Sequence, residues 1–157
     1  MAQIKNDHAG IYFSEVFEQK EKLQQKFFKE CIKKTNQFSA QFVLDKMFQE
    51  HMRHLNELKV EVGILKAEKI SRELCHSFQS EVYFVNLCKD YDLSTLTLSE
   101  AARLAIRMEE RDLDFFRGVL DNPLSDNSKR ALKKIISHKA DFIKYLKREQ
   151  ERILTRD

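Results

Sequence analysis

The chain has 157 residues, of which 42% are apolar and 34% charged, with three glycines, one proline and no tryptophan. Because glycine and proline are so scarce, the composition excludes a turn-rich β-sandwich or barrel and favours long helices in one domain. Lys and Arg total 28 against 25 Asp and Glu, and the two signs are interspersed, so no nucleic-acid-binding stripe is indicated.

Two helices are expected in the first half of the chain. Apolar residues recur at steps of three, four and seven, which predicts a first helix over residues 10–34 and a second over residues 37–64. The stretch 65–96 is less periodic, with a short helix expected near 73–86. This stretch is long enough to cross the length of a helical bundle.

Two further helices are expected after this crossover. Thr97-Leu98-Ser99-Glu100 has the form of a capping box, so a third helix is predicted over residues 98–121. Pro123 ends it, because proline cannot donate the next helical hydrogen bond. A fourth helix is predicted over residues 126–152. Two tight turns and one long crossover give two antiparallel hairpins, so the sequence predicts one all-α, four-helix-bundle domain over residues 1–157.

The two predicted hairpins resemble each other in sequence. The pattern of Glu, five residues and Phe-Phe begins at Glu21 and again at Glu109, an offset of 88 residues (109 minus 21). On the second helix of each hairpin, His51 and His138 correspond at an offset of 87 (138 minus 51). We interpret this as an internal repeat, the alternative being chance similarity in a helical chain rich in Lys and Glu.

Acidic and imidazole side chains interrupt the inward apolar stripe of every predicted helix. The first and third helices each carry one inward glutamate, and the second and fourth each carry a pair at i, i+3, which projects from one face. An unpaired carboxylate in an apolar interior costs several kcal/mol, so a metal, a buried cation or a raised pKa must neutralise these glutamates. The six candidate metal ligands are Glu21, His51, His54, Glu109, His138 and Asp141.

The segment from Thr97 to Leu120 carries the clearest likeness to a known family. An alanine-rich stripe leads into Glu109 and then an aromatic pair, and the chain over about residues 10–150 resembles the ferritin-like superfamily, most closely its rubrerythrin-type branch. Such proteins are four-helix bundles that bind two iron or manganese ions through single glutamates on two helices and Glu-x-x-His motifs on the other two. The resemblance implies an iron-dependent oxidoreductase, or a protein that handles peroxide or iron.

Carried over position by position, the resemblance assigns Glu21 and Glu109 to the single-glutamate positions and the two i, i+3 pairs to the Glu-x-x-His motifs. The two glutamates that bridge the metals in the family are then His51 and His138, and an imidazole cannot bridge two ions. The resemblance therefore implies an altered centre with one or two ions of iron, zinc or manganese. It also implies a homodimer and, because no C-x-x-C motif is present, a separate redox partner.

A competing interpretation is a bundle without metal. Hydrogen bonds between histidines and carboxylates would then hold the polar interior, and the protein would act as a structural or protein-interaction module.

The number of cysteines, three, is odd and fits no disulfide framework. No run approaches the roughly 18 apolar residues of a membrane helix. We therefore expect a cytoplasmic protein without a membrane partner.

Overall fold

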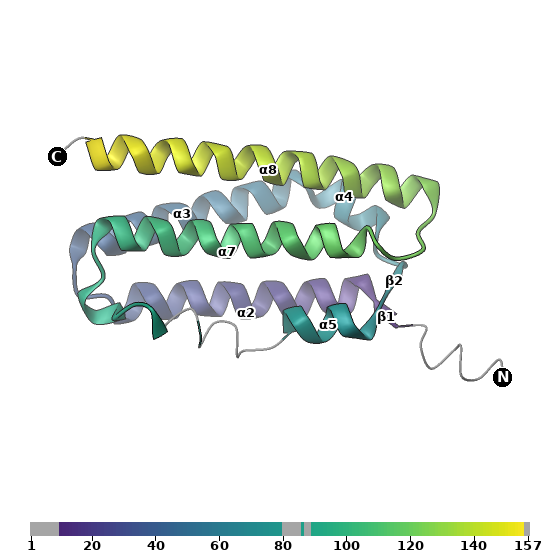
Figure 1. Ribbon diagram of the computed structural model, residues 1–157, viewed down its shortest axis with the longest axis horizontal. Helices are drawn as coiled ribbons and strands as arrows, with labels where there is room; N and C mark the ends of the chain where they lie inside the picture. Colours follow the sequence, from purple (N-terminus) through teal and green to yellow (C-terminus); the bar gives the residue numbers. More distant parts are fainter. Residues whose placement is uncertain (1–9, 80–85, 87–88, 156–157) are drawn as a thin grey trace.

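Four long helices dominate the part of the chain that the computed structural model describes, residues 10–79, 86 and 89–155 (Figure 1). The long helices are α2 (Phe13–Lys34), α3 (Phe38–Glu57), α7 (Leu98–Val119) and α8 (Asp126–Thr155). The shorter elements are β1 (Ile11–Tyr12), α4 (Lys59–Ile64), β2 (Lys69–Ile70), α5 (Arg72–Gln79) and the 3-10 helix η1 (Leu93–Thr95).

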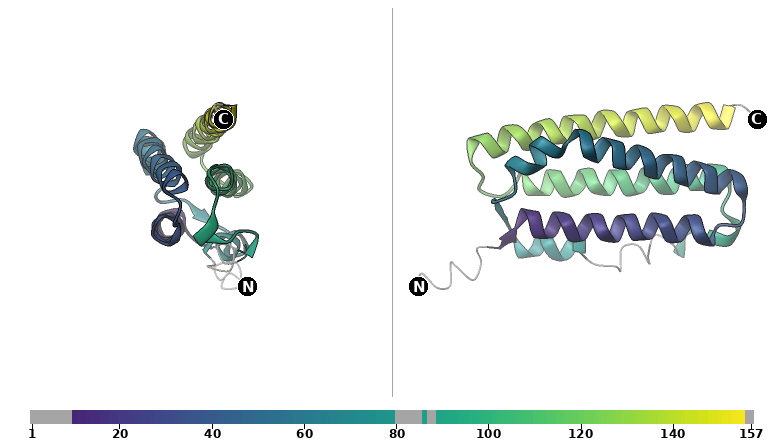
Figure 2. Two further views of the ribbon diagram at one scale, coloured as in Figure 1. Left: turned by 90° about the vertical axis from the view of Figure 1, so that its left-hand side faces the viewer. Right: turned by 180° about the vertical axis from the view of Figure 1, so that it is seen from behind.

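The four long helices lie side by side along the length of the molecule (Figure 1), and Figure 2 shows them end-on and from behind. Short turns join α2 to α3 and α7 to α8, so each pair is antiparallel. Helix α3 packs against both α2 and α7, and α7 packs against α8. The predicted all-α class is therefore confirmed.

Side-chain hydrogen bonds cap both ends of α7, and the capping box at its start is the one that the sequence predicts. The Thr97 hydroxyl accepts a hydrogen bond from the Glu100 amide at 3.1 Å, and the Glu100 carboxylate accepts one from the Thr97 amide at 3.1 Å. At the other end, the Asn122 side-chain amide donates to the carbonyls of Gly118 and Val119, just before the only proline. These bonds satisfy backbone groups that a helix end leaves without partners.

Several helix ends differ from the prediction by up to three residues, and two departures from the predicted helices have a structural cause. Helix α2 begins at Phe13, because residues 11–12 form β1 and pair with β2. Gly10 precedes β1 with φ of 81°, and a Cβ there would lie 1.8 Å from the Ile70 carbonyl oxygen, so only glycine fits. The predicted helix 37–64 is interrupted at Leu58, whose ψ of 5° departs from helical geometry while its side chain is buried.

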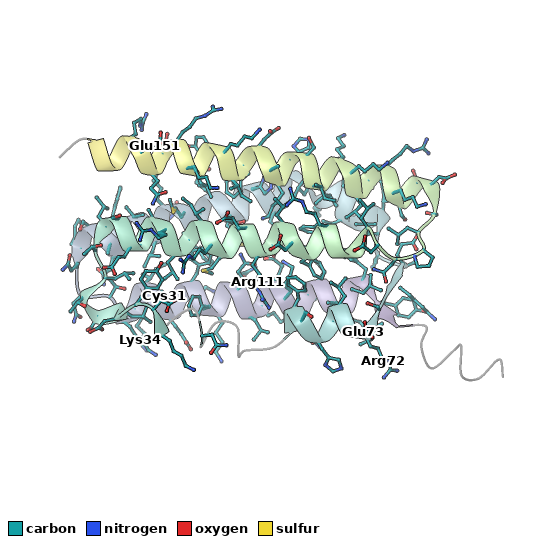
Figure 3. All side chains as sticks on the ribbon, in the orientation of Figure 1. Cys31, Lys34, Arg72, Glu73, Arg111 and Glu151 are labelled. Atoms are coloured by element: carbon teal, nitrogen blue, oxygen red, sulfur yellow. The ribbon has the colours of Figure 1, made fainter. Side chains whose placement is uncertain are left out.

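The crossover between the hairpins includes α5, which packs against both α2 and α7. Arg111 of α7, labelled in Figure 3, lies beside α5 and donates a hydrogen bond of 2.7 Å to the Ser77 carbonyl. Its guanidinium also lies 4.7 Å from the centre of the Phe78 ring. The predicted short helix is thus confirmed over its first part, and residues 80–85 of that prediction lie outside the described residues.

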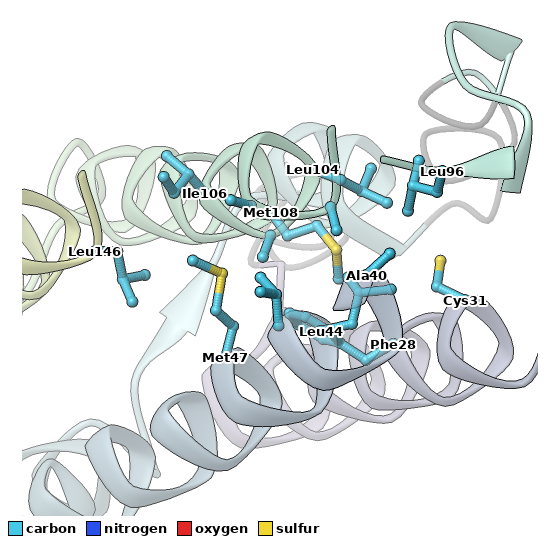
Figure 4. Close-up of a cluster of buried hydrophobic side chains, with 14 of the residues drawn as sticks. Phe28, Cys31, Ala40, Leu44, Met47, Leu96, Leu104, Ile106, Met108 and Leu146 are labelled. Carbon is cyan, nitrogen blue, oxygen red and sulfur yellow. The ribbon is translucent and has the colours of Figure 1, made fainter. Parts of the chain in front are cut away.

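The buried apolar side chains form two clusters along the bundle. The first, in Figure 4, joins α2, α3, α7 and α8 around Leu44, Leu104 and Met108. The second surrounds Phe13 and Phe116 near the opposite end. Between them, at the level of residues 20–21 of α2 and 109–112 of α7, the buried side chains are charged. The fold therefore places a polar layer between two apolar ones.

Candidate functional site: a buried ionic ring

Six charged side chains from all four long helices meet in this polar layer. Each is at most 5% exposed, and each contacts two others of opposite charge, so the contacts close into a circle. We call this group the ionic ring. Its members, in order around the circle, are Lys20, Asp112, Lys139, Glu109, His51 and Glu21.

The two lysines connect the carboxylates of α2 and α7. Lys20 Nζ lies 3.0 Å from Glu21 Oε1 and also contacts Asp112 Oδ1. Lys139 Nζ of α8 lies 2.7 Å from Asp112 Oδ2 and 2.6 Å from Glu109 Oε2. Asp112 is therefore bridged by two ammonium groups, one through each oxygen.

His51 of α3 closes the circle on the other side. Its Nδ1 lies 2.5 Å from Glu109 Oε1, and its Nε2 lies 3.0 Å from Glu21 Oε2. Burial alone would lower the pKa of His51, but the carboxylates of Glu109 and Glu21 outweigh it and raise the pKa to about 10. His51 is thus an imidazolium at neutral pH and donates through both nitrogens.

The charges of the ionic ring cancel. Burial would raise the pKa of Glu109, but His51 and Lys139 outweigh it and lower the pKa to about 2. The pKa of Lys139 is raised above its usual value, since Asp112 and Glu109 outweigh the cost of burial. Three carboxylates therefore face three cations, and each carboxylate oxygen contacts one cation.

Aromatic rings surround the lysine ammoniums. Lys20 Nζ lies 5.1, 5.4 and 5.7 Å from the ring centres of Phe17, Phe115 and Phe116. Lys139 Nζ lies 5.7 Å from that of Phe142. Aromatic faces attract cations and exclude water, so the aromatic residues help to hold the charges in the interior.

Four of the six predicted ligands are buried at this level of the bundle. Glu21, His51 and Glu109 are members of the ionic ring, in agreement with the inward positions expected for them. His54 lies one turn further along α3, stacked on Phe142 with ring centres 4.4 Å apart. Burial and the charge of Lys139 lower the pKa of His54 to about 4, so it is neutral, and its Nε2 has no hydrogen-bond partner in the described part of the chain.

The inward orientation expected for His138 and Asp141 is wrong. Both side chains are exposed, on the outer side of α8. The buried residues of α8 here are Ile135, Lys139 and Phe142, at steps of four and three, so the inward stripe passes through the neighbour of His138. Ile135 and Phe142 are seven residues apart, so the helical spacing allows either His138 or Lys139 to face inward between them. The sequence prediction placed His138 on the inward face, whereas the buried residue is its neighbour Lys139.

Three members of the ionic ring were not among the expected residues: Lys20, Asp112 and Lys139. The internal repeat in the sequence indicates one of these residues, Lys139. Lys139 lies 88 residues after His51 (139 minus 51), the same offset that relates Glu21 to Glu109, whereas His138 requires 87. A constant offset would have indicated Lys139 as the inward residue.

Three residues of the ionic ring have the chemistry of a metal site. One ligand atom each of His51, Glu109 and Asp112 lies within 4.8 Å of the other two. Lys139, however, contacts both carboxylates, and His51 donates to Glu109. A divalent ion needs compensating negative charge, and the three cations of the ionic ring already neutralise its three carboxylates. In this arrangement the residues do not fit a divalent ion.

The chain matches no protein-family model, no curated protein and no solved structure. Among the described residues, none of the helices has both the length and the apolar character needed to cross a membrane.

Proposed function

We propose that this protein is a ferritin-like four-helix bundle without metal, in which two lysine ammoniums occupy the positions of two metal ions. It acts as a protein-interaction module in the cytoplasm. The observation that supports the proposal is the complete pairing of carboxylate oxygens with cations in the ionic ring. A metal centre uses the same oxygens as ligands, so the two arrangements exclude each other.

The inward pairs on α3 and α8 support this proposal. In a ferritin-like di-metal bundle two helices each contribute Glu-x-x-His. At that spacing the inward residues are His51 and His54 on α3, and Lys139 and Phe142 on α8. Lysine takes the place of one bridging glutamate and phenylalanine that of one imidazole ligand. Both changes remove a ligand, and the first also supplies a positive charge.

The exposed surface of the bundle is suited to binding another protein, whereas the buried ionic ring is poorly suited to catalysis. The members of the ionic ring are at most 5% exposed, so a substrate reaches them only if the bundle opens. By contrast, Phe38 and Phe42 of α3 are 81% and 62% exposed. Exposed aromatic side chains close together are typical of protein–protein interfaces.

A second candidate function retains the metal chemistry implied by the family resemblance. The ligand atoms of His51, Glu109 and Asp112 support it, since they lie close enough to share one ion. This candidate requires Lys139 to leave both carboxylates and His51 to lose a proton. The protein would then bind iron or another divalent metal, with oxidoreductase or iron-handling activity.

Metal analysis separates the two candidates. We expect protein purified without chelator to contain no stoichiometric metal, and its melting temperature to stay unchanged on addition of Fe²⁺, Mn²⁺ or Zn²⁺. In the variant Lys139→Glu a cation is replaced by a fourth carboxylate. We expect this variant to gain a metal-dependent rise in melting temperature, since the layer then carries an excess of two negative charges.

The matched control is Lys144→Glu, which makes the same change at an exposed position of α8 and should respond to no metal. Stoichiometric metal in the unaltered protein, together with a rise in its melting temperature on metal addition, would overturn the proposal. A Lys139→Glu protein that folds but ignores metal would contradict the assignment of Lys139 to a metal position.

A further inference from the structure

Two adjoining hollows form one groove along the seam between α3 and α8. The first has a volume of about 300 Å³ and extends along α3 from Phe42 to Glu50. The second has a volume of about 320 Å³ and extends along α3 from Arg53 to Glu57. Tyr145 of α8 borders both hollows. Helix α3 rises by about 22 Å between Phe42 and Glu57, so the groove is about four helical turns long.

The two helices that line the groove pack mainly against other helices. Helix α3 packs against α2 and α7, and α8 packs against α7 and α4. Across the groove, His54 stacks on Phe142, and Lys46 Nζ lies 3.9 Å from Glu149 Oε2. A hollow seam between two helices with little direct packing is the shape into which a further helix fits.

The floor of the groove is apolar along both hollows. In the first hollow Val43, Met47 and Leu146 are at most 5% exposed, and Met47 and Leu146 lie next to each other in Figure 4. In the second hollow Phe142 is 8% exposed. Tyr145 stands between the hollows and is 37% exposed. The groove therefore presents an apolar strip that can cover the apolar stripe of an amphipathic helix.

The α3 edge of the groove carries charges of alternating sign. They follow one another at steps of four, three and four residues, so they lie in one line along the helix. These residues are Lys46, Glu50, Arg53 and Glu57. A uniformly acidic or uniformly basic ligand would meet a like charge at every second position. A helix with Glu and Lys in alternation at the same steps meets an opposite charge at each one.

We propose that the α3–α8 groove binds an amphipathic helix of about four turns from a different protein. The apolar stripe of that helix lies on the floor, and its flank toward α3 carries acidic and basic residues in alternation. In the described part of this chain the long helices bury their own apolar stripes in the bundle, so a second copy offers no such helix. This inference rests on the proposed function, since it names the kind of partner. Tyr145 is the central contact.

Selection from a displayed library of helical peptides tests the site. Each peptide has about 18 residues, a fixed stripe of leucines, and Glu, Lys or Gln at random along both flanks. We expect the unaltered protein to enrich peptides that carry Glu and Lys in alternation along one flank. Tyr145→Asp should weaken binding of an enriched peptide about tenfold or more, because it places a charge in the middle of the groove.

The matched control is Tyr12→Asp on β1. It makes the same change at a residue that is 46% exposed and does not line the groove. This variant should bind the enriched peptide as the unaltered protein does. Circular dichroism checks that both variants keep their helices.

An exchange of two charges on α3 tests the alternation itself. Arg53 contacts Glu50 one turn away, so the double variant Glu50→Arg/Arg53→Glu keeps both this ion pair and the net charge. It reverses only the order of charges that faces the partner. We expect it to bind the enriched peptide about tenfold more weakly, and a peptide with the two facing charges exchanged should restore binding.

Failure of the unaltered protein to enrich any peptide, or enrichment without alternating charge, would overturn the docking site. So would a Tyr145→Asp variant that binds like the unaltered protein. A dimer of the unaltered protein that an enriched peptide splits would also overturn it, since a second copy would then occupy the groove. A protein without metal that enriches no peptide contradicts only the docking site, whereas a metal-containing protein that binds the peptides contradicts only the metal-free bundle.

Discussion

The ionic ring and the apolar cluster around Leu104 are buried to the same extent but are stabilised in different ways. In the apolar cluster each side chain contributes roughly in proportion to the apolar surface that it buries, and it needs no partner of opposite charge. In the ionic ring each side chain is tolerated only because two others neutralise it. The apolar cluster therefore tolerates apolar substitutions of similar volume, whereas the ionic ring depends on being complete.

The largest expected effect comes from removal of one cation from the ionic ring. Lys139→Met keeps a side chain of similar length but leaves Glu109 and Asp112 with fewer cations than negative charges. We expect the free energy of unfolding to fall by about 3–5 kcal/mol, the usual cost of leaving a buried charge uncompensated. Urea unfolding monitored by circular dichroism measures this change.

Two further variants show whether the loss reflects the charge. Lys144→Met alters an exposed lysine of the same helix and should change stability by less than about 0.5 kcal/mol. Adding Asp112→Leu to Lys139→Met removes one negative charge and restores the balance, so it should recover part of the loss. A double variant that is less stable than additivity predicts would contradict the role given to charge balance.

Truncation in the apolar cluster should have a somewhat smaller effect. Leu104 is completely buried, and Leu104→Ala should lower the free energy of unfolding by about 3 kcal/mol through lost burial and the remaining cavity. Leu104→Met nearly conserves volume and should cost less than about 1.5 kcal/mol. Both effects, measured by urea unfolding, should be independent of pH, in contrast to those in the ionic ring.

The smallest effect is the response of the whole protein to alkaline pH. The pKa of His51 is about 10 in the folded protein against 6.5 in the unfolded chain. Its contribution to stability is therefore complete below pH 6.5 and is lost as the pH rises through 10. Between pH 7 and pH 9 we expect the free energy of unfolding to fall by about 2–3 kcal/mol, at 1.36 kcal/mol per pH unit.

Variants assign this pH dependence to the ionic ring. His51→Gln should be less stable at pH 7 and show a much flatter profile from pH 7 to pH 9, whereas Leu104→Ala should keep the slope of the unaltered protein. If the free energy of unfolding fell equally with pH in the unaltered protein and in His51→Gln, a group other than His51 would cause the pH dependence.

Most of the fold could be predicted from the sequence because its signals are local. The capping box at Thr97 begins α7 where expected, and the turn before Pro123 separates α7 from α8. The break at Leu58 and the pairing of β1 with β2 could not be predicted, because both depend on contacts between segments distant in sequence. Spacing within one segment carries no information about such contacts.

The candidate site was predicted only in part, since Asp112 and both lysines of the ionic ring were missed. Glu21, His51 and Glu109 were found because acidic and imidazole groups on an apolar stripe are unexpected. Lys20 and Lys139 were not found, since a lysine on a helix usually reaches solvent and its inward orientation depends on carboxylates from other helices. The exposed His138 was chosen instead, one position away.

The ionic ring also determines which half of the chain pairs with which. The hairpin of α2 and α3 supplies Lys20, His51 and Glu21, an excess of one positive charge, and the hairpin of α7 and α8 supplies the opposite excess. Two copies of the same hairpin would bring like charges together in a dry interior, whereas unlike hairpins neutralise each other. Although the halves resemble each other in sequence, this asymmetry opposes self-pairing of either one during assembly.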